Sequence, residues 1–405
     1  MAFDHKSDFP IFTSHPSLIY LDHAATSQKP QMVITRMSQY LEESNGSPHR
    51  GAHLLSVEAT RQYDYGRARV AEFINASRPE EIVFTKNATE ALNLIAYSYG
   101  RSFLSEGDEI VIAITSHHSN IVPWQMLAKE KGARVVYLYI DSEGEFLPGE
   151  FDKIGARTKI VTFPWVSNGL GCIHDVEALI QKAHEQGAVA IVDAAQAIGH
   201  MHVDVKRLDA DFLVFSGHKM YGPTGVGVLY GKHGLLDAMP PFLMGGDMIE
   251  YVEEQSTTFA QVPERFEAGT QHVEGVVGLI AAIDFITLVG VDHIKEKEQR
   301  IAKYAVRKLS ELPFIKVLGP SVDRERGALV AFEVEGIHPH DVASLLDSRG
   351  IAIRAGHHCT QPMMKFLGLS ASCRASFSIY NYVEEVDALV DALIYVREVF
   401  GYVNR

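Results

Sequence analysis

Short apolar runs alternate with longer amphipathic segments through the middle of this chain, and this alternation limits the possible folds most strongly. The apolar runs fall at residues 81–85, 109–115, 134–140, 159–163, 188–192 and 211–215. Segments with helical periodicity lie between them, such as 88–99, 123–131 and the stretch that Asp175 can cap. Strands that alternate with helices predict a mostly parallel sheet covered by helices on both faces, which is an α/β fold.

The pattern changes after about residue 289, where a charged helix over 291–312 is expected. The later elements are expected as strands at 328–333, 351–354 and 375–379 and as helices at 339–348 and from about Glu384. We therefore expect a large domain at residues 20–288 and a smaller α+β domain at 289–405. The segment 1–19 is expected to pack on the smaller domain.

Composition and charge argue against several classes of protein. The chain has 405 residues, of which 46% are hydrophobic and 22% are charged, as in a soluble two-domain enzyme. Its formal net charge is −14, which disfavours nucleic-acid binding because phosphate neutralisation needs concentrated Lys and Arg. Asp284 interrupts the most apolar stretch, and the first residues lack a signal pattern. We expect a cytoplasmic protein that binds neither nucleic acid nor membrane.

The chain contains three cysteines, which are Cys172, Cys359 and Cys373. No pair of them has the C-x-x-C spacing, so neither a disulfide framework nor a cysteine-rich zinc module is expected.

Two polar strings follow predicted strands. Lys219 comes just after Ser216 and His218 and precedes a glycine-rich turn, a pattern equally typical of a surface lysine and of a Schiff-base lysine. Asp193 ends another strand and Gln196 follows it; this Asp could bind a metal, cap a helix or hold a protonated heterocycle. The spacing from Asp193 to Lys219 suits two neighbouring strands of one sheet.

Two further strings carry weaker signals. Residues 85–90 form a strand-to-helix turn whose free amides suit a phosphate, although Thr89 by itself is more typical of an ordinary helix start. His117 and His118 follow another strand end, and adjacent histidines are more often structural or metal-related than partners for a stacked ring.

Taken together, these strings resemble the aspartate-aminotransferase fold type of pyridoxal phosphate (PLP) enzymes and, within it, the class V group. The nearest resemblance is to the SufS-type (group II) cysteine desulfurases and selenocysteine lyases, and it extends from Tyr20 to the last helix. The matching landmarks, in chain order, are residues 20–26, 49–53, 117–120, 166–168, 193–196, 216–219, 265–270, 354–359 and 373–376.

The resemblance implies roles around the cofactor ring. Lys219 would hold PLP as a Schiff base, and Asp193 would pair with the pyridinium nitrogen. Gln196 would hydrogen-bond the ring oxygen. His117 would stack on the ring and is the best candidate for moving protons, because the ordinary pKa of histidine suits proton transfer near neutral pH.

The resemblance also implies a phosphate site made by Ser216, His218, Thr89 and the backbone amide of Ala88. Family members often have a hydroxyl residue where this chain has Ala88, so one side-chain contact is in doubt. Thr270 would reach the phosphate of the neighbouring subunit, which implies a homodimer with shared active sites.

For the substrate, the resemblance implies that Arg374 binds the carboxylate and that Asn168 and Arg354 contribute to the same site. Cys359 would be the nucleophile, whereas a buried and inert thiol, the usual state of a free cysteine, suits Cys373 and Cys172 better. The short stretch between Cys359 and Arg374 resembles group II rather than the longer mobile segment of group I.

The implied reaction removes sulfur from L-cysteine, giving L-alanine and a persulfide on Cys359. The persulfide would pass to a SufE- or SufU-like acceptor protein, for iron–sulfur cluster assembly. A selenocysteine lyase remains an alternative that need not depend on Cys359. A metal-binding protein that uses His117, His118 and the His357–Cys359 string is a further alternative. The acidic stretch 245–263 either shapes a dimer or acceptor surface or is a solvated loop.

Overall fold

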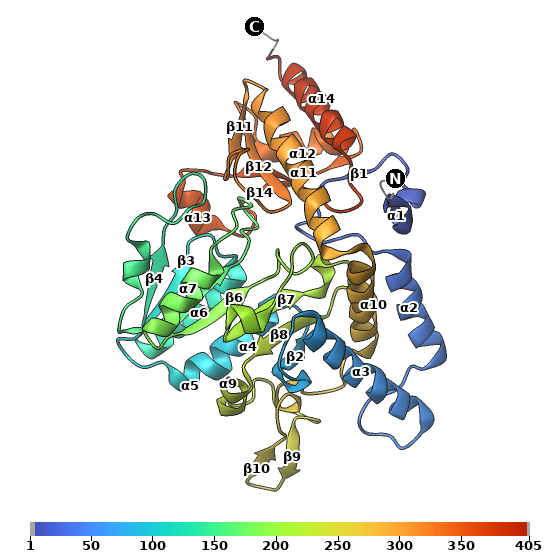
Figure 1. Ribbon diagram of the computed structural model, residues 1–405, viewed down its shortest axis with the longest axis vertical. Coiled ribbons are helices and arrows are strands. Elements are labelled where there is room, and N and C mark those ends of the chain that lie inside the picture. The colour runs from blue at the N-terminus through green and yellow to red at the C-terminus, as the bar shows by residue number, and fades with distance from the viewer. Residues whose placement is uncertain (1–4, 403–405) are drawn as a thin grey trace.

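The computed structural model describes residues 5–402, and most of them surround a seven-stranded sheet (Figure 1). In spatial order its strands are β2 (Ile82–Thr85), β8 (Gly227–Gly231), β7 (Phe212–Ser216), β6 (Val189–Asp193), β5 (Thr158–Pro164), β3 (Glu109–Ala113) and β4 (Arg134–Leu138). Strands from β7 to β4 are parallel, while β8 runs antiparallel to both of its neighbours. The prediction of a mostly parallel α/β sheet is therefore confirmed.

Each face of this sheet is covered by its own hydrophobic cluster. Side chains alternate across a strand, so Val111 and Ala113 of β3 join one cluster while Ile110 and Ile112 join the other. The first cluster includes residues of α2 (Gln31–Glu43), α3 (Leu54–Phe73), α7 (Val176–Glu185), α8 (Val205–Leu208) and α10 (Val273–Val289). The second includes residues of α4 (Ala88–Ile95), α6 (Val122–Lys131) and α9 (His233–Ala238).

Capping residues define where several of these helices begin. The Asp175 side chain accepts a hydrogen bond from the Ala178 amide, which confirms the cap predicted for α7. Asn87 caps α4 in the same way, through the amide of Glu90. The helix expected over 88–99 is regular only to Ile95, and a π-helical turn over Ala96–Gly100 and the short α5 (Arg101–Phe103) follow.

The C-terminal part of the chain forms an antiparallel four-stranded sheet. Its strands, in spatial order, are β11 (Ile315–Leu318), β12 (Leu329–Val334), β15 (Ser372–Ser376) and β14 (Arg354–Gly356). Its helices are α11 (Val291–Ser310), α12 (Pro339–Asp347), α13 (Gln361–Phe366) and α14 (Val383–Val399). Strand β15 begins before the expected range 375–379, because Ser372 and Arg374 break the apolar run that was used to locate it.

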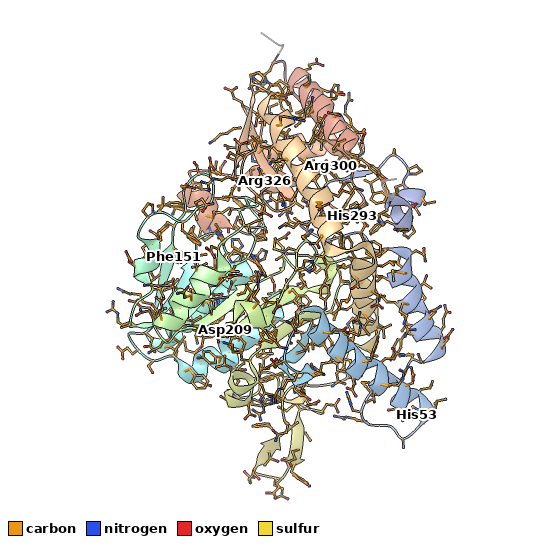
Figure 2. All side chains as sticks on the ribbon, viewed as in Figure 1. His53, Phe151, Asp209, His293, Arg300 and Arg326 are labelled. Atoms are coloured by element: carbon orange, nitrogen blue, oxygen red, sulfur yellow. The ribbon has the colours of Figure 1, made fainter. Side chains whose placement is uncertain are left out.

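Helices α10 and α11 meet at Gly290, whose φ of 89° allows an angle of 77° between them. We propose that the two domains divide at this joint, and we use the names large domain and small domain for the parts before and after it. Arg326, labelled in Figure 2, links the two parts. Its guanidinium donates to the Pro320 carbonyl at 2.8 Å and to the Leu170 carbonyl at 3.1 Å.

The N-terminal segment touches both parts of the chain. It contains α1 (Pro10–Ser14) and β1 (Ile19–Tyr20), and β1 pairs with β13 (Ile351–Ala352) of the small domain. Phe9, just before α1, packs against Tyr221 and Phe285 on the large-domain side and against Tyr380 on the other.

Within residues 5–402 no single helix is long and apolar enough to cross a membrane. Only α10 and α11 taken together, bent at Gly290, meet that criterion by length and composition.

Candidate active site

A cavity of about 210 Å³ lies beyond the carboxyl ends of β5, β6 and β7 and beside the start of α4. Ligands of open α/β sheets bind at this edge of the sheet. The cavity brings together almost all of the predicted site residues, which are Ala88, Thr89, His117, Asn168, Asp193, Gln196, Ser216, His218, Lys219, Arg354, Cys359 and Arg374. Among the predicted site residues only Thr270 lies elsewhere, in a separate cavity of about 190 Å³.

Lys219 and Asp193 come from neighbouring parallel strands, as their spacing predicted. Asp193 ends β6, and Lys219 lies in the short turn that follows β7. Lys219 borders the cavity but lies deep in the protein, and this desolvation lowers its pKa, while Asp193 acts in the opposite direction. Burial raises the pKa of Asp193 against the effects of Lys219 and of the Ala195 amide, which donates to its Oδ1 at 3.0 Å. The result is a half-buried amine that borders the cavity, opposite a buried acid.

The start of α4 also borders the cavity, through Ala88 and Thr89. The Ala88 amide donates to Ser216 Oγ at 2.9 Å, so a residue of β7 already meets the first turn of this helix. His218 lies beside Thr26, with its Nδ1 3.2 Å from Thr26 Oγ1. Burial, followed by the charge of Lys219, lowers the pKa of His218 to about 4, so its ring is neutral at neutral pH. Backbone amides at a helix start and uncharged donors suit an anion such as a phosphate.

His117 lies at the cavity edge with a fixed ring orientation. Its Nδ1 is 2.8 Å from Ser119 Oγ and accepts from the Ser119 amide at 3.1 Å. Burial, followed by the charge of Lys219, lowers its pKa to about 3. The expectation of an ordinary histidine pKa is therefore wrong for this structure, because the site is desolvated and already carries a cation.

Cys359 lies on a half-exposed loop with unusual backbone geometry. His358 and Cys359 have φ values of 51° and 58°, in the left-handed region that non-glycine residues seldom occupy. The loop is tied to the large domain: the His118 amide donates to the Cys359 carbonyl at 2.8 Å, and Asn168 Nδ2 donates to the His358 carbonyl at 2.6 Å. The Gln361 amide also donates to His118 Nε2 at 3.0 Å.

The other two cysteines lie in the protein interior, unlike Cys359. Cys172 and Cys373 are buried, and burial raises the pKa of each thiol to about 12. Both are therefore protonated and inert, as expected from their apolar settings.

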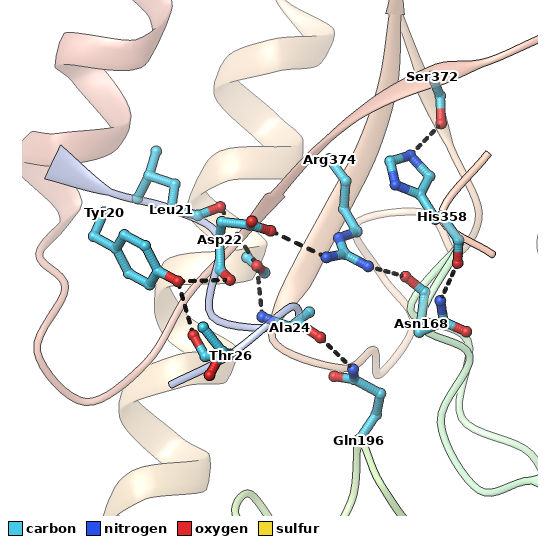
Figure 3. Close-up of polar contacts among 11 residues, drawn as sticks. Tyr20, Leu21, Asp22, Ala24, Thr26, Asn168, Gln196, His358, Ser372 and Arg374 are labelled. Atoms are coloured by element: carbon cyan, nitrogen blue, oxygen red, sulfur yellow. Dashed lines mark hydrogen bonds and ion pairs between the residues drawn. The ribbon is translucent and has the colours of Figure 1, made fainter. Parts of the chain in front are cut away.

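Arg374 lies on β15, and its guanidinium is held from two sides (Figure 3). Its Nη1 donates to the Asn168 carbonyl at 2.8 Å, and its Nη2 pairs with Asp22 Oδ1 at 3.1 Å. Its buried Nε has no partner among the described residues. Arg354 lies directly opposite Arg374 on β14, so two guanidiniums share one face of the small sheet and one border of the cavity.

Three of these contacts were missed by sequence reasoning. Asp22 reaches Arg374 from far along the chain, and His118 was considered only as half of a histidine pair. Asn168 was expected at the substrate, but in this structure its side chain holds the Cys359 loop and its carbonyl holds Arg374. The string 20–26 marked the place of Asp22, although nothing in it indicated the partner.

A second cavity of about 520 Å³ adjoins the first and shares Thr89, His117 and Ser119 with it. It lacks Lys219, Asp193 and Cys359, so the chemistry lies in the smaller cavity. Within the described part of the chain no three His, Cys, Asp or Glu side chains are grouped to hold a metal ion.

The donor set of the smaller cavity fits PLP. An amine can bond to an aldehyde, and a buried acid can hold a protonated pyridine nitrogen. The start of a helix can hold a phosphate. Lys219, Asp193 and the first turn of α4 supply these three functions within one cavity. Gln196 also borders it, although its Nε2 donates to the Ala24 carbonyl at 2.8 Å in this structure.

Comparison with protein-family models gives a match over most of the chain. Residues 19–389 match the family described as aminotransferase class-V. A protein of Halalkalibacterium halodurans named probable cysteine desulfurase is 47% identical over 99% of both chains. A cysteine desulfurase of Pectobacterium carotovorum is 45% identical over 98% of both chains.

Solved structures give the same result. The apo structure of a cysteine desulfurase from Thermococcus onnurineus superposes with a TM-score of 0.92, at 42% identity over 98% of both chains. The S-sulfonic acid form of the cysteine desulfurase CsdA from Escherichia coli superposes with a TM-score of 0.90, at 37% identity over 97% of this chain and 98% of that one.

Proposed function

This chain belongs to the aminotransferase class-V family, and we propose that it is a PLP-dependent cysteine desulfurase. The observation that carries the proposal is that Lys219, Asp193 and the nucleophile candidate Cys359 border one cavity. Relatives that share 45–47% of their residues with this chain over almost its whole length are named cysteine desulfurases or probable cysteine desulfurases.

When bound, PLP supplies an electron sink for bonds at the α-carbon of an amino acid. Lys219 would bond to its aldehyde, and Asp193 would pair with the protonated ring nitrogen. The phosphate would be held by the Ala88 amide, Thr89, Ser216 and His218. Water has little access to this end of the cavity, because Asp193, Ser216 and Ala88 are all buried.

The substrate carboxylate binds at Arg374 and Arg354, and the contacts of Asn168 keep Arg374 oriented. His117 would stack on the cofactor ring. Its Nδ1 accepts from the Ser119 amide, so the neutral imidazole carries its proton on Nε2. Because the pKa of His117 is lowered to about 3, its ring is a weak base that stays neutral at neutral pH, and its proposed part is to pass a proton on at the substrate without holding a charge.

Cys359 completes the reaction. Its Sγ attacks the substrate sulfur, a sulfur–sulfur bond forms, and the bond from that sulfur to the β-carbon breaks. The electron pair stays with the carbon, which takes up a proton and becomes the methyl group of alanine. The persulfide that remains on Cys359 lies on a half-exposed loop, where a second protein can reach it.

The proposal includes a homodimer with shared sites. Thr270 does not border the cavity of its own chain, but lies on a surface cavity with Leu243 and Phe242. Leu243 of this cavity and the next residue, Met244, are exposed apolar side chains. The stretch 245–263 forms a hairpin of β9 (Ile249–Val252) and β10 (Thr257–Phe259) that projects from the large domain (Figure 1).

The proposed acceptor is a SufE- or SufU-like protein, the proposed destination of the sulfur is iron–sulfur cluster assembly, and the proposed location is the cytoplasm. These three points rest on the resemblance to SufS-type enzymes, together with the position of Cys359 on a loop.

The test is to incubate the PLP-loaded protein with L-cysteine and to measure alanine and persulfide, with and without candidate acceptor proteins. We expect one alanine per sulfur transferred, a persulfide on Cys359, and faster turnover with the correct acceptor. A Cys359→Ala variant that still forms alanine from cysteine at the wild-type rate would exclude this mechanism. Running selenocysteine beside cysteine on that variant separates a lyase from a desulfurase.

A further inference from the structure

Asp22 lies next to the proposed carboxylate site but does not border the cavity. It follows β1, forms a bridge to Ser376 of β15 and pairs with Arg374 Nη2 (Figure 3). Its neighbour Ala24 donates to Ser376 Oγ at 2.9 Å and accepts from Gln196 Nε2. Asp22 is therefore held between the small sheet and the large-domain side of the site.

Asp22 faces two like charges. Arg354 and Arg374 are directly opposed on β14 and β15, and both lower the pKa of the Asp22 carboxyl, against the larger opposite effect of its burial. Like charges directly opposed across a sheet destabilise each other unless an opposite charge lies close. Asp22 is that charge, because its carboxylate is within 3.1 Å of one guanidinium and is largely shielded from water.

Asp22 also orients Arg374. The Asp22 carboxylate and the Asn168 carbonyl engage the two Nη atoms, which fixes the plane of the guanidinium. The buried Nε stays free of any partner in the described structure. Arg374 is thus held in one orientation at the border of the cavity, with N–H donors in excess of the two contacts that fix it.

The charges give a simple sum. Two guanidiniums carry +2 and Asp22 carries −1, so the cluster presents a net +1 to the cavity. One ligand carboxylate neutralises that charge. A second carboxylate would find no further positive charge in this cluster, and the nearby half-buried carboxylate of Asp22 would repel it.

We propose that Asp22 is a positioning residue that sets the charge selectivity of this site: it restricts the ligand to one carboxylate group and disfavours dicarboxylates. This inference deepens the proposed function, on which it rests for the premise that the ligand is an amino acid.

The test compares two ligands of almost the same size, succinate and its half-amide succinamate, which differ by one negative charge. Calorimetry on the PLP-loaded protein at pH 8 and low salt gives a dissociation constant for each. The Asp22→Asn variant keeps an oxygen for Arg374 Nη2 but loses the charge. We expect the ratio of the two constants to shift at least fivefold towards succinate in this variant.

Two further variants complete the test. Asp22→Ala removes both the charge and the hydrogen bond, so both ligands should bind more weakly than to Asp22→Asn. Glu333→Gln removes an acid of the same sheet that pairs with Lys316, away from the cavity, and should leave the ratio unchanged. A ratio in Asp22→Asn within twofold of the wild-type value would overturn the inference, provided that the variant shows the wild-type thermal midpoint.

The inference and the proposed function can fail separately. Cysteine turnover is measured on the same wild-type preparation, and absence of alanine would count against a desulfurase without affecting the binding ratio. If the wild type turns over cysteine but the ratio does not move in Asp22→Asn, only the role of Asp22 fails. Should Asp22→Asn shift the ratio, an increase in KM for cysteine at similar kcat in Asp22→Ala would confirm that Arg374 is positioned by Asp22.

Discussion

Lys219 and Cys359 border the same cavity, yet the two sides that carry them are built in different ways. Lys219 follows a fully buried strand, and Asp193 ends the strand next to it. Cys359 lies on a half-exposed loop whose backbone is left-handed at two successive residues. Such residues cost about 1–3 kcal/mol each and persist only where their surroundings hold them.

The difference shows where each side obtains its rigidity. The cofactor side is held by the packing of the large sheet, which exists before any ligand arrives. The thiol side depends on a few hydrogen bonds from the other domain, chiefly those of His118 and Asn168. Variants should therefore be able to disable one side while the other remains intact.

The largest expected effect is that of Lys219→Ala. The variant should lose the Schiff-base absorption band and all cysteine turnover, because Lys219 is the one lysine among the described residues that border the cavity. The rate at which iodoacetamide alkylates Cys359, measured by mass spectrometry, should stay within twofold of the rate in the cofactor-free wild type. Lys316→Ala, which changes an exposed lysine of the small sheet away from the cavity, is the control and should behave as wild type. If Lys219→Ala also changed the reactivity of Cys359, the two sides would not be independent.

Cys359→Ala should give the opposite result. The absorption band of PLP should remain, whereas persulfide formation should vanish and cysteine turnover should fall by roughly 10³-fold or more. In the wild-type protein, Cys359 should react with iodoacetamide at least about 100 times faster than Cys172 or Cys373, because the pKa of each buried thiol is raised to about 12. Equal rates of labelling at the three cysteines would contradict the prediction that Cys359 is reactive and the two buried thiols are inert.

His118 tests the connection between the two sides. Its ring accepts the Gln361 amide, and His118→Ala removes this contact, so the loop should loosen and turnover should fall by about tenfold. The PLP band should be unchanged, and the alkylation rate of Cys359 should change with the turnover. His118→Gln restores an acceptor oxygen and should recover part of both. Wild-type turnover in both His118→Ala and His118→Gln would show that the contact between His118 and Gln361 does not matter for activity.

The smallest expected effect is a pH dependence of stability rather than a change in activity. Burial lowers the pKa of His358, in the loop, to about 3, so between about pH 3 and 6.5 the unfolded chain binds a proton that the folded chain does not. The contribution of His358 to the free energy of unfolding therefore rises with pH across this window and is constant above it. Denaturant unfolding should show that the free energy of unfolding of the wild type is lower at pH 4.5 than at pH 7.5. In His358→Gln this difference should be smaller by roughly 2–3 kcal/mol. An equal loss in both proteins would assign the acid sensitivity to other groups.

The sequence predicted the cofactor side better than the thiol side. Apolar runs identified β6 and β7, and the position of a residue just after such a run placed Asp193, Ser216 and Lys219 at one edge of the sheet. The strand that carries Arg374 was misplaced, because its polar residues interrupt the pattern. Periodicity locates elements that bury one continuous apolar face, and it loses those whose residues face a site.

By itself, the sequence determined the α/β architecture and the chemical identity of the site residues, because periodicity, strand ends and motif strings are local along the chain. Only the tertiary structure decided which of them meet. Asp22 and Arg374 are far apart in the chain, and so are Asn168 and His358, yet each pair is in hydrogen-bond contact. It also decided the low pKa of His117, because desolvation depends on how the whole chain closes around the ring.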